Sequence, residues 1–421
     1  MTDLTAEAPV LTTRDGKPLK ASLARALRRE KLRSLMLIAP LLVFIVVTFL
    51  APIADMLFRS IDNRIVAETL PKTVVALAQW DETSGNLPDE TVFQALHDDL
   101  LIAVEEKTHT RLGSRLNYEA SGMSSLFRTT GRRVKRMEDG SYAEQFINAD
   151  KDWGDVKTWQ ILKRFSPPYT AGYFLNAVDA QVTPDGIEMK PENQRLYLLL
   201  FARTMMLSLI ITFSCLLFGY PIAYLLATLP LRYSNLLMIL VLLPFWTSLL
   251  VRTSAWKVLL QQQGVINDAL VWAGLVSNTD RLVLINNQTG TIIAMTHILM
   301  PFMILPLYSV MKTISPSYVR AAKSLGATDW TAFWRVYFPQ TVPGIGAGAI
   351  LVFILSIGYY ITPELVGGTE GIFISNRIAY HISSSLNWGL AAALGVILLA
   401  MVLLLFYVYD RIVGIDNVKL G

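Results

Sequence analysis

Long apolar runs separated by polar segments dominate the pattern of this chain. Six of the runs are long enough to cross the hydrocarbon core of a bilayer as a helix, which takes about 20 residues. They cover Leu35–Phe58, Leu196–Leu229, Leu236–Leu260, Thr291–Met311, Val342–Thr362 and Gly389–Tyr409. The pattern predicts an all-α polytopic membrane protein with six transmembrane helices.

A polar stretch, residues 59–195, lies between the first two runs and shows helical periodicity of its own. After Pro88-Asp89-Glu90, apolar residues recur at helical spacing at Phe93, Leu96, Leu100, Leu101 and Val104. A second amphipathic helix is predicted over Trp153–Phe165, whereas residues 113–140 are basic and turn-rich and predict looser structure. We interpret the stretch as a large, mostly helical insertion. Whether it is inert or forms a docking surface for a soluble partner stays open.

The polar segment 315–340 separates the fourth and fifth runs and predicts two short helices joined at a glycine. Ser315-Pro316 suits a helix start, and Gly326 suits a left-handed helix end. Thr328 or Asp329 can cap a second helix, on which one aromatic face is formed by Trp330, Phe333, Trp334, Tyr337 and Phe338. We expect Pro339 and Pro343 to close this second helix and to set the angle of the next span.

Composition agrees with a membrane protein, because only 17% of the 421 residues are charged and 53% are hydrophobic. Soluble domains average about 25% charged residues. The net charge of +4 is too small to indicate a nucleic-acid partner. The single cysteine, Cys215, excludes a disulfide framework.

Basic residues in the short segments predict the orientation in the membrane. Residues 1–34 carry eight Lys and Arg, and the segment between the fourth and fifth runs carries Lys312, Arg320, Lys323 and Arg335. Residues 410–421 add Arg411 and Lys419. Six spans place these three segments on one side, which the positive-inside rule assigns to the cytoplasm. Both termini are therefore predicted to be cytoplasmic, and residues 59–195 to lie on the opposite side.

Motifs for catalysis or nucleotide binding do not occur in the sequence. There is no G-x-x-x-x-G-K-[ST], no H-E-x-x-H and no G-x-S-x-G, and the four histidines are dispersed. We therefore expect neither an enzyme nor a bound cofactor.

Two interpretations of the segment 315–340 compete. An amphipathic helix resting among lipid headgroups would explain the aromatic face. A helix pair that docks into a cytoplasmic protein explains more, because the small residues Ala321 and Ala322 beside Gly326 permit close approach of another surface. We favour docking.

The segment also resembles a known motif. Ala321-Ala322-x-x-x-Gly326-Ala327, followed twelve residues later by Pro339, is similar to the "EAA" loop of binding-protein-dependent ABC importer permeases, with Arg320 in place of the leading Glu. Further stretches resemble the spermidine/putrescine type: RTMMLSLIITFSCLLFGYPIAYLLA (203–227), LPFWTSLLVRTSAW (243–256), GVIN (264–267) and ITPELVGG (361–368). The likeness covers the first run and the chain from Leu196 onward. The 59–195 insertion is longer than is typical.

This resemblance implies a type I ABC importer bundle in a bacterial inner membrane. Its partners would be an ATPase dimer that binds ATP and Mg²⁺, a second permease subunit and a periplasmic binding protein, and the solute would be a small, polyamine-like cation. The residues implied to contact the ATPase are Arg320, Ala321, Ala322, Leu325, Gly326, Ala327, Trp330, Phe333 and Pro339.

Ionisable residues in the predicted spans suggest where the solute passes. They gather toward the outer leaflet, and such residues often line a cavity. Pro363 and Gly367-Gly368 flank Glu364 and predict a broken helix there. We expect an outer gate formed by Glu364 with Asp268 and Trp246, which Arg252 closes by pairing with Glu364 when no solute is bound.

The predicted domains are a basic cytoplasmic tail (1–34), a first span (35–58), a periplasmic insertion (59–195), a five-helix core with the coupling loop (196–409) and a C-terminal tail (410–421). An ion-coupled carrier of small amines or amino-acid derivatives is the nearest alternative, but no carboxylate lies deep in a predicted span. A membrane-embedded enzyme lacks a catalytic set, and a membrane anchor that displays 59–195 leaves five spans unexplained.

Overall fold

The computed structural model describes residues 19–183 and 186–413 and divides into two units. The first unit ends at Phe58 and contains one long helix, in which α1 (Leu19–Ile45) continues through a π turn, η1 (Val46–Leu50), into α2 (Ala51–Phe58). Its part from Leu27 to Phe58 contains an apolar stretch and is long enough to cross a membrane. The second unit begins at Arg59 and contains the insertion and the remaining helices of the described chain.

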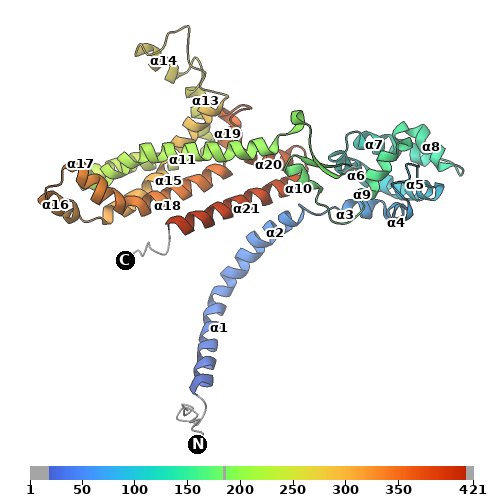
Figure 1. Cartoon of the computed structure of the whole chain (residues 1–421), viewed down its shortest axis with the longest axis horizontal. Helices are drawn as coiled ribbons and strands as arrows, with labels where there is room; N and C mark the ends of the chain where they lie inside the picture. The colour runs from blue at the N-terminus through green and yellow to red at the C-terminus, as the bar shows by residue number, and fades with distance from the viewer. Residues whose placement is uncertain (1–18, 184–185, 414–421) are drawn as a thin grey trace, which may run out of the picture. The chain divides into compact units, whose positions relative to one another are not determined.

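Four long helices of the second unit pack side by side in a bundle (Figure 1). They are α11 (Tyr197–Thr228), α15 (Gln288–Thr313), α18 (Phe338–Gly358) and α21 (Trp388–Val413). The seam between α11, α15 and α18 is filled by buried apolar side chains such as Leu207, Met303 and Val352. Gly348 lets α18 approach α15 closely, because a Cβ there would lie 2.7 Å from the Met303 sulfur.

The third predicted span is bent, not straight. Helix α12 (Leu231–Leu242) and the short η5 (Leu243–Trp246) meet α13 (Leu249–Leu259) at an angle of 98°. Pro244 lies within η5, and Ser248 caps α13 by accepting from the Val251 N–H at 3.2 Å. After α13 the chain forms α14 (Val265–Trp272) and a loop that returns to α15.

The end of the fifth predicted span is separated from α18. Helix α18 ends at Gly358, Tyr359 and Tyr360 interrupt the helix, and α19 (Ile361–Val366) follows. The predicted break near Pro363 therefore lies just before that residue. Five helices of the described chain are long and apolar enough to cross a membrane, or six if the bent pair α12–α13 counts as one span. The prediction of an all-α polytopic membrane protein is confirmed.

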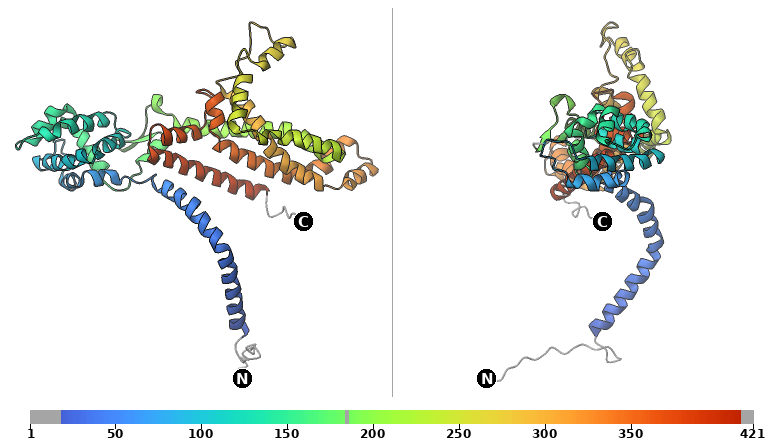
Figure 2. Two further views of the ribbon diagram at one scale, coloured as in Figure 1. Left: turned by 180° about the vertical axis from the view of Figure 1, so that it is seen from behind. Right: turned by 90° about the vertical axis from the view of Figure 1, so that its right-hand side faces the viewer.

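The insertion folds as a cluster of short helices around an apolar core (Figures 1 and 2). Their bounds are α3 (Arg64–Thr69), α4 (Pro71–Gln79), α5 (Glu90–Glu105), α6 (Thr108–Asn117), α7 (Met123–Arg133), η2 (Val134–Arg136), α8 (Tyr142–Ala149), η3 (Lys151–Gly154), α9 (Val156–Arg164) and α10 (Gly172–Ala177). Trp153 and Trp159 are fully buried at its centre. The prediction of looser structure over residues 113–140 is wrong, because α6 and α7 bury Leu116, Leu126 and Phe127 in that core.

A short antiparallel hairpin, β1 (Ala180–Thr183) with β2 (Gly186–Met189), connects the insertion to η4 (Glu192–Gln194) and α11. It folds the chain back so that the buried carboxylate of Asp179 meets the start of α11. That carboxylate accepts from the backbone N–H groups of Leu196, Tyr197 and Leu198 at 2.8–3.1 Å. The anionic oxygens satisfy donors that a helix start leaves unpaired.

The insertion also packs directly on the bundle beside α20 (Ile374–Ser383). The Tyr173 ring lies so close to Gly389 that a Cβ there would be 2.3 Å from it. The Tyr118 hydroxyl donates to the Ser385 carbonyl at 2.7 Å. His381 bonds to the Tyr197 hydroxyl and the Ser385 hydroxyl at 2.9 and 2.8 Å, and burial lowers the pKa of His381 to about 4. A neutral imidazole therefore fills this junction at pH 7.

Candidate functional site

Two regions at opposite ends of the bundle hold the residues predicted to be functional (Figure 1). The segment 315–340 joins the end of α15 to α18, and α13, α19 and α20 lie toward the opposite ends of α15 and α18.

The first helix of the segment, α16 (Pro316–Ser324), begins as the sequence predicts. Ser315 is its N-cap and accepts from the Ser317 N–H at 3.4 Å, and Pro316 occupies the first turn. The helix ends at Ser324, and Leu325 is its C-cap. There the Gly326 N–H donates to the Lys323 carbonyl at 3.0 Å and the Ala327 N–H to the Ala322 carbonyl at 3.1 Å. These two bonds form a Schellman end, which needs a left-handed residue.

Gly326 supplies that residue, with φ of +89°. No atom lies within 4 Å of the position that a Cβ would take, so the demand for glycine is conformational and not steric. Thr328 then caps α17 (Asp329–Ala332) by accepting from the Thr331 N–H at 3.3 Å. The predicted helix–glycine–helix geometry is present.

The expected stop at Pro339 and Pro343 is wrong. Helix α17 continues through a π turn, η6 (Phe333–Tyr337), into α18, and both prolines lie within that continuous helix. Pro339 has no N–H to donate to the helix. The widened π turn, which ends two residues earlier, accommodates this missing donor, and so the helix continues. The second helix of the segment is thus the first part of the fifth span and is firmly connected to the bundle.

The predicted aromatic face is divided between two surroundings. Phe333 and Tyr337 pack against Tyr220 and Tyr224 of α11, with ring centroids 5.4–6.3 Å apart. Trp330 and Trp334 pair with each other at 5.6 Å and face outward. One half of the face anchors the segment, and the other half remains available to a partner.

The tip of the segment is apolar and uncovered. Leu325 is 90% exposed and Trp330 is 73% exposed. Ala321 and Pro339 are exposed as well, whereas Ala322, Ala327 and Phe333 are half-buried. Lys323 pairs with Asp329, but the exposed side chain of Arg320 has no hydrogen bond or ion pair within the described residues. The tip therefore presents apolar side chains together with one unpaired cation.

At the other end, Glu364 is held by α20. Its Oε2 accepts from the Asn376 Nδ2 at 2.6 Å, and the same nitrogen donates to the Tyr360 carbonyl at 2.9 Å. The Asn376 Oδ1 in turn accepts from the Phe373 N–H, which completes the cap of α20. The Asn376 side chain thus fixes the position of the Glu364 carboxylate, and Glu364 stays exposed. Asn376 had no signal in the sequence, since its contact joins two elements across a loop.

The expected pair between Arg252 and Glu364 does not form among the described residues. Helices α13 and α19 meet through Thr253 and Thr362, whose hydroxyl oxygens lie 3.1 Å apart. Since neighbouring helical residues point about 100° apart, the face that presents Thr253 to α19 turns Arg252 away. The Arg252 Nε is buried and has no hydrogen-bond partner in the described structure.

Trp246 and Asp268 have surroundings that differ from those of Glu364. Trp246 is 76% exposed at the corner between α12 and α13. Asp268 forms an ion pair with Arg281 at 2.8 Å, which ties α14 to the loop that follows it. The structure therefore gives Asp268 a local ion-pair partner, and within the described residues no hydrogen bond or ion pair joins Trp246, Arg252 or Asp268 to Glu364.

Close backbone contacts fix the loop after α19, which the sequence did not predict. A Cβ on Gly367 or Gly371 would lie 2.5 Å from the Thr291 hydroxyl, and one on Gly368 would lie 2.5 Å from the Asn286 carbonyl. The Thr291 hydroxyl donates to the Gly371 carbonyl at 3.1 Å. The glycines therefore let the loop pack directly against the start of α15, which holds α19 and Glu364 in place.

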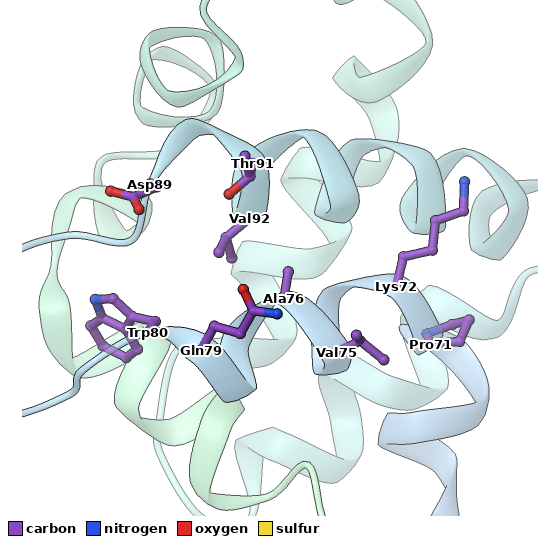
Figure 3. A pocket seen from close by; sticks show the side chains of 9 residues that line it. All are labelled: Pro71, Lys72, Val75, Ala76, Gln79, Trp80, Asp89, Thr91 and Val92. Carbon is purple, nitrogen blue, oxygen red and sulfur yellow. The ribbon is translucent and has the colours of Figure 1, made fainter.

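A groove of about 590 Å³ lies on the insertion between α4 and the start of α5 (Figure 3). Its charged side chains, Lys72 and Asp89, stand at opposite ends, and Gln79, Thr91 and the exposed Val75 lie between them. The Lys72 Nζ is already bonded to Asp98 at 2.8 Å. Because its charged groups do not converge, the groove does not have the arrangement that is typical of a small-molecule site.

Comparisons with known proteins place the bundle in a family. The family model described as "Binding-protein-dependent transport system inner membrane component" matches residues 217–414. The chain is 37% identical over 216 residues to the spermidine/putrescine transport system permease protein PotB of Haemophilus influenzae, which covers 51% of this chain and 75% of that protein. It is 34% identical over 224 residues to PotB of Escherichia coli, which covers 53% of this chain and 81% of that protein.

Among solved structures, a bacterial ABC transporter involved in the import of the acidic polysaccharide alginate is 21% identical, with a TM-score of 0.43. That match covers 68% of this chain and 99% of the other. The family match begins within α11, covers α15, α18, α21 and the segment 315–340, and does not include the insertion.

Proposed function

Because this chain belongs to the family of binding-protein-dependent transport system inner membrane components, we propose that it forms the path of a small, polyamine-like cation and is driven through the segment 315–340. The chain is a multi-pass permease subunit of an ABC importer. The permeases named for spermidine and putrescine are its relatives over about half of this chain. The proposed solute class, a polyamine-like cation, follows the names of these relatives.

The segment 315–340 is proposed to dock into a partner ATPase, which binds ATP and Mg²⁺ in place of this chain. The observation that supports docking is the exposed tip formed by Leu325 and Trp330. The base of the segment packs against α11 through Tyr337 and Tyr224. Tryptophan is enriched among the residues that contribute most of the binding energy at protein interfaces, and an exposed leucine beside it adds apolar area that binding can bury. The continuous helix α17–η6–α18 would carry a push at the tip directly into the bundle.

We place this segment and both termini in the cytoplasm, and the insertion in the periplasm with the binding protein. The four basic residues of the segment against one acid support this orientation. A second, distinct permease subunit would complete the path.

Co-purification tests the docking proposal. A tagged chain expressed in its own host is expected to retain a protein with a G-x-x-x-x-G-K-[ST] motif, identified by mass spectrometry. Leu325→Glu should reduce that retention about tenfold or more, because it places a charge in an apolar contact. Leu275→Glu is the matched control, since Leu275 is also highly exposed but lies in the loop after α14. Equal retention by both variants would contradict the proposal.

Glu364 is proposed to receive the cationic solute at the outer end. Its carboxylate is held by Asn376 and remains exposed, and an exposed anionic group attracts a cation. Glu364→Gln keeps the shape and removes the charge, and we expect the uptake KM for a polyamine to rise about tenfold. Glu370→Gln, an exposed acid in the following loop, is the control. An unchanged KM in Glu364→Gln would rule out this role.

A further inference from the structure

A cleft of about 520 Å³ separates the insertion from the start of α21 and is rich in arginine. Its lining includes Arg59, Arg111, Arg115 and Trp388, together with one acid, Asp62. Both Asp62 oxygens are already held by Arg64, at 2.9 Å each. The charge that remains in the cleft is positive.

Arg115 lies almost entirely buried in the cleft wall, with 5% of its surface exposed. Its Nη1 bonds to Glu119 at 2.7 Å, and its guanidinium lies 4.2 Å from the Tyr173 ring centroid. Its Nε and Nη2 are buried and have no hydrogen-bond acceptor in the described residues. Buried donors are nearly always satisfied, so these two nitrogens point to an acceptor that comes from outside the chain.

Two more arginines reach the cleft from its rim. Arg111 on α6 is exposed, and its side chain makes no hydrogen bond or ion pair within the part of the chain that the structure describes. The Arg59 guanidinium lies 5.8 Å from the Trp388 ring centroid. Planar guanidinium groups bind phosphate and carboxylate oxygens in pairs.

The position of the cleft along the chain indicates which anion it meets. Arg59 directly follows the last residue of the first span, and Trp388 is the first residue of the last span. Tryptophan prefers the membrane–water interface, and arginine at a span end extends toward headgroup phosphates. The cleft therefore lies at the level of the lipid headgroups.

From these contacts we propose that the cleft binds the phosphate group of an anionic phospholipid. The lipid would occupy the space between Arg59, Arg111 and the buried Arg115, and would fasten the base of the insertion to the bilayer surface. This inference does not depend on which solute is transported.

Thermal unfolding of the purified full-length chain in neutral detergent tests the proposal. Short-chain phosphatidylglycerol is expected to raise the unfolding temperature in a saturable way, and phosphatidylcholine of the same chain length much less. The double variant Arg59→Gln/Arg111→Gln should weaken the apparent phosphatidylglycerol affinity about tenfold or more. Both side chains are exposed, so the fold should survive, which circular dichroism checks.

The double variant Arg128→Gln/Arg132→Gln is the matched control, because both arginines are exposed on α7 and line no part of the cleft. Glycerol phosphate that stabilises as well as phosphatidylglycerol would support the anion site and reject the lipid as its source. Equal affinity for phosphatidylglycerol in the cleft variant and the wild type would overturn the proposal, as would equal stabilisation by the two lipids.

Discussion

Gly326→Pro is expected to abolish uptake while the chain still inserts into the membrane. Gly326 holds φ of +89°, a conformation closed to proline, whose ring fixes φ near −65°. The substitution also removes the N–H that donates to the Lys323 carbonyl at 3.0 Å. Without the Schellman end, α16 and α17 lose their fixed relative direction, and the tip that carries Leu325 can no longer dock as a unit. Uptake by intact cells, with membrane-fraction immunoblots, measures both outcomes.

A second glycine in the chain provides a matched control. Gly274 follows α14 with φ of +69°, has no atom within 4 Å of a Cβ position, and lies in a similar helix end, where the Leu275 N–H donates to the Leu270 carbonyl at 3.0 Å. Gly274→Pro should disturb its own loop equally but leave substantial uptake. The hinge role would be refuted by wild-type uptake in Gly326→Pro, or by an equal loss in both variants.

The features that the sequence predicted correctly depend on neighbours in the chain. A run of about 20 apolar residues predicts a span by length alone. Ser315 and Thr328 cap helices whose N–H groups lie two and three residues later. Such contacts are local and therefore appear in the pattern of residues.

The features that failed depend on contacts between distant elements. Pro339 looked like a helix end, but the π turn of Phe333–Tyr337 and packing on Tyr224 keep the helix continuous. Arg252 and Glu364 carry opposite charges, yet the Thr253–Thr362 contact decides which faces of α13 and α19 meet. Asn376, twelve residues from Glu364, became visible as its partner only in three dimensions.

The role of Asp179 also depends on a contact that the sequence pattern does not reveal. We expect its replacement to loosen the connection between the insertion and the bundle. Asp179 is fully buried, and its carboxylate accepts three N–H groups at the start of α11. Asp179→Ala leaves these partly buried donors without their acceptor, at a cost of about 2 kcal/mol. Alanine must also adopt the φ of +56° seen at this position, which adds about 1 kcal/mol. Thermal unfolding in detergent should shift down by several degrees.

Two further variants separate the cap from general damage. Asp179→Asn keeps an acceptor oxygen and tolerates positive φ, and so it should lose markedly less stability than Asp179→Ala. Asp81→Ala is the surface control, because Asp81 accepts from the Thr83 N–H at 2.9 Å in an exposed turn, and its loss should cost under about 1 kcal/mol. Protease cleavage between residues 180 and 196 should rise in Asp179→Ala alone, because the hairpin is held in place by this cap. If Asp179→Ala unfolded at the wild-type temperature and resisted protease equally, the start of α11 would be held by packing on the bundle and not by this carboxylate.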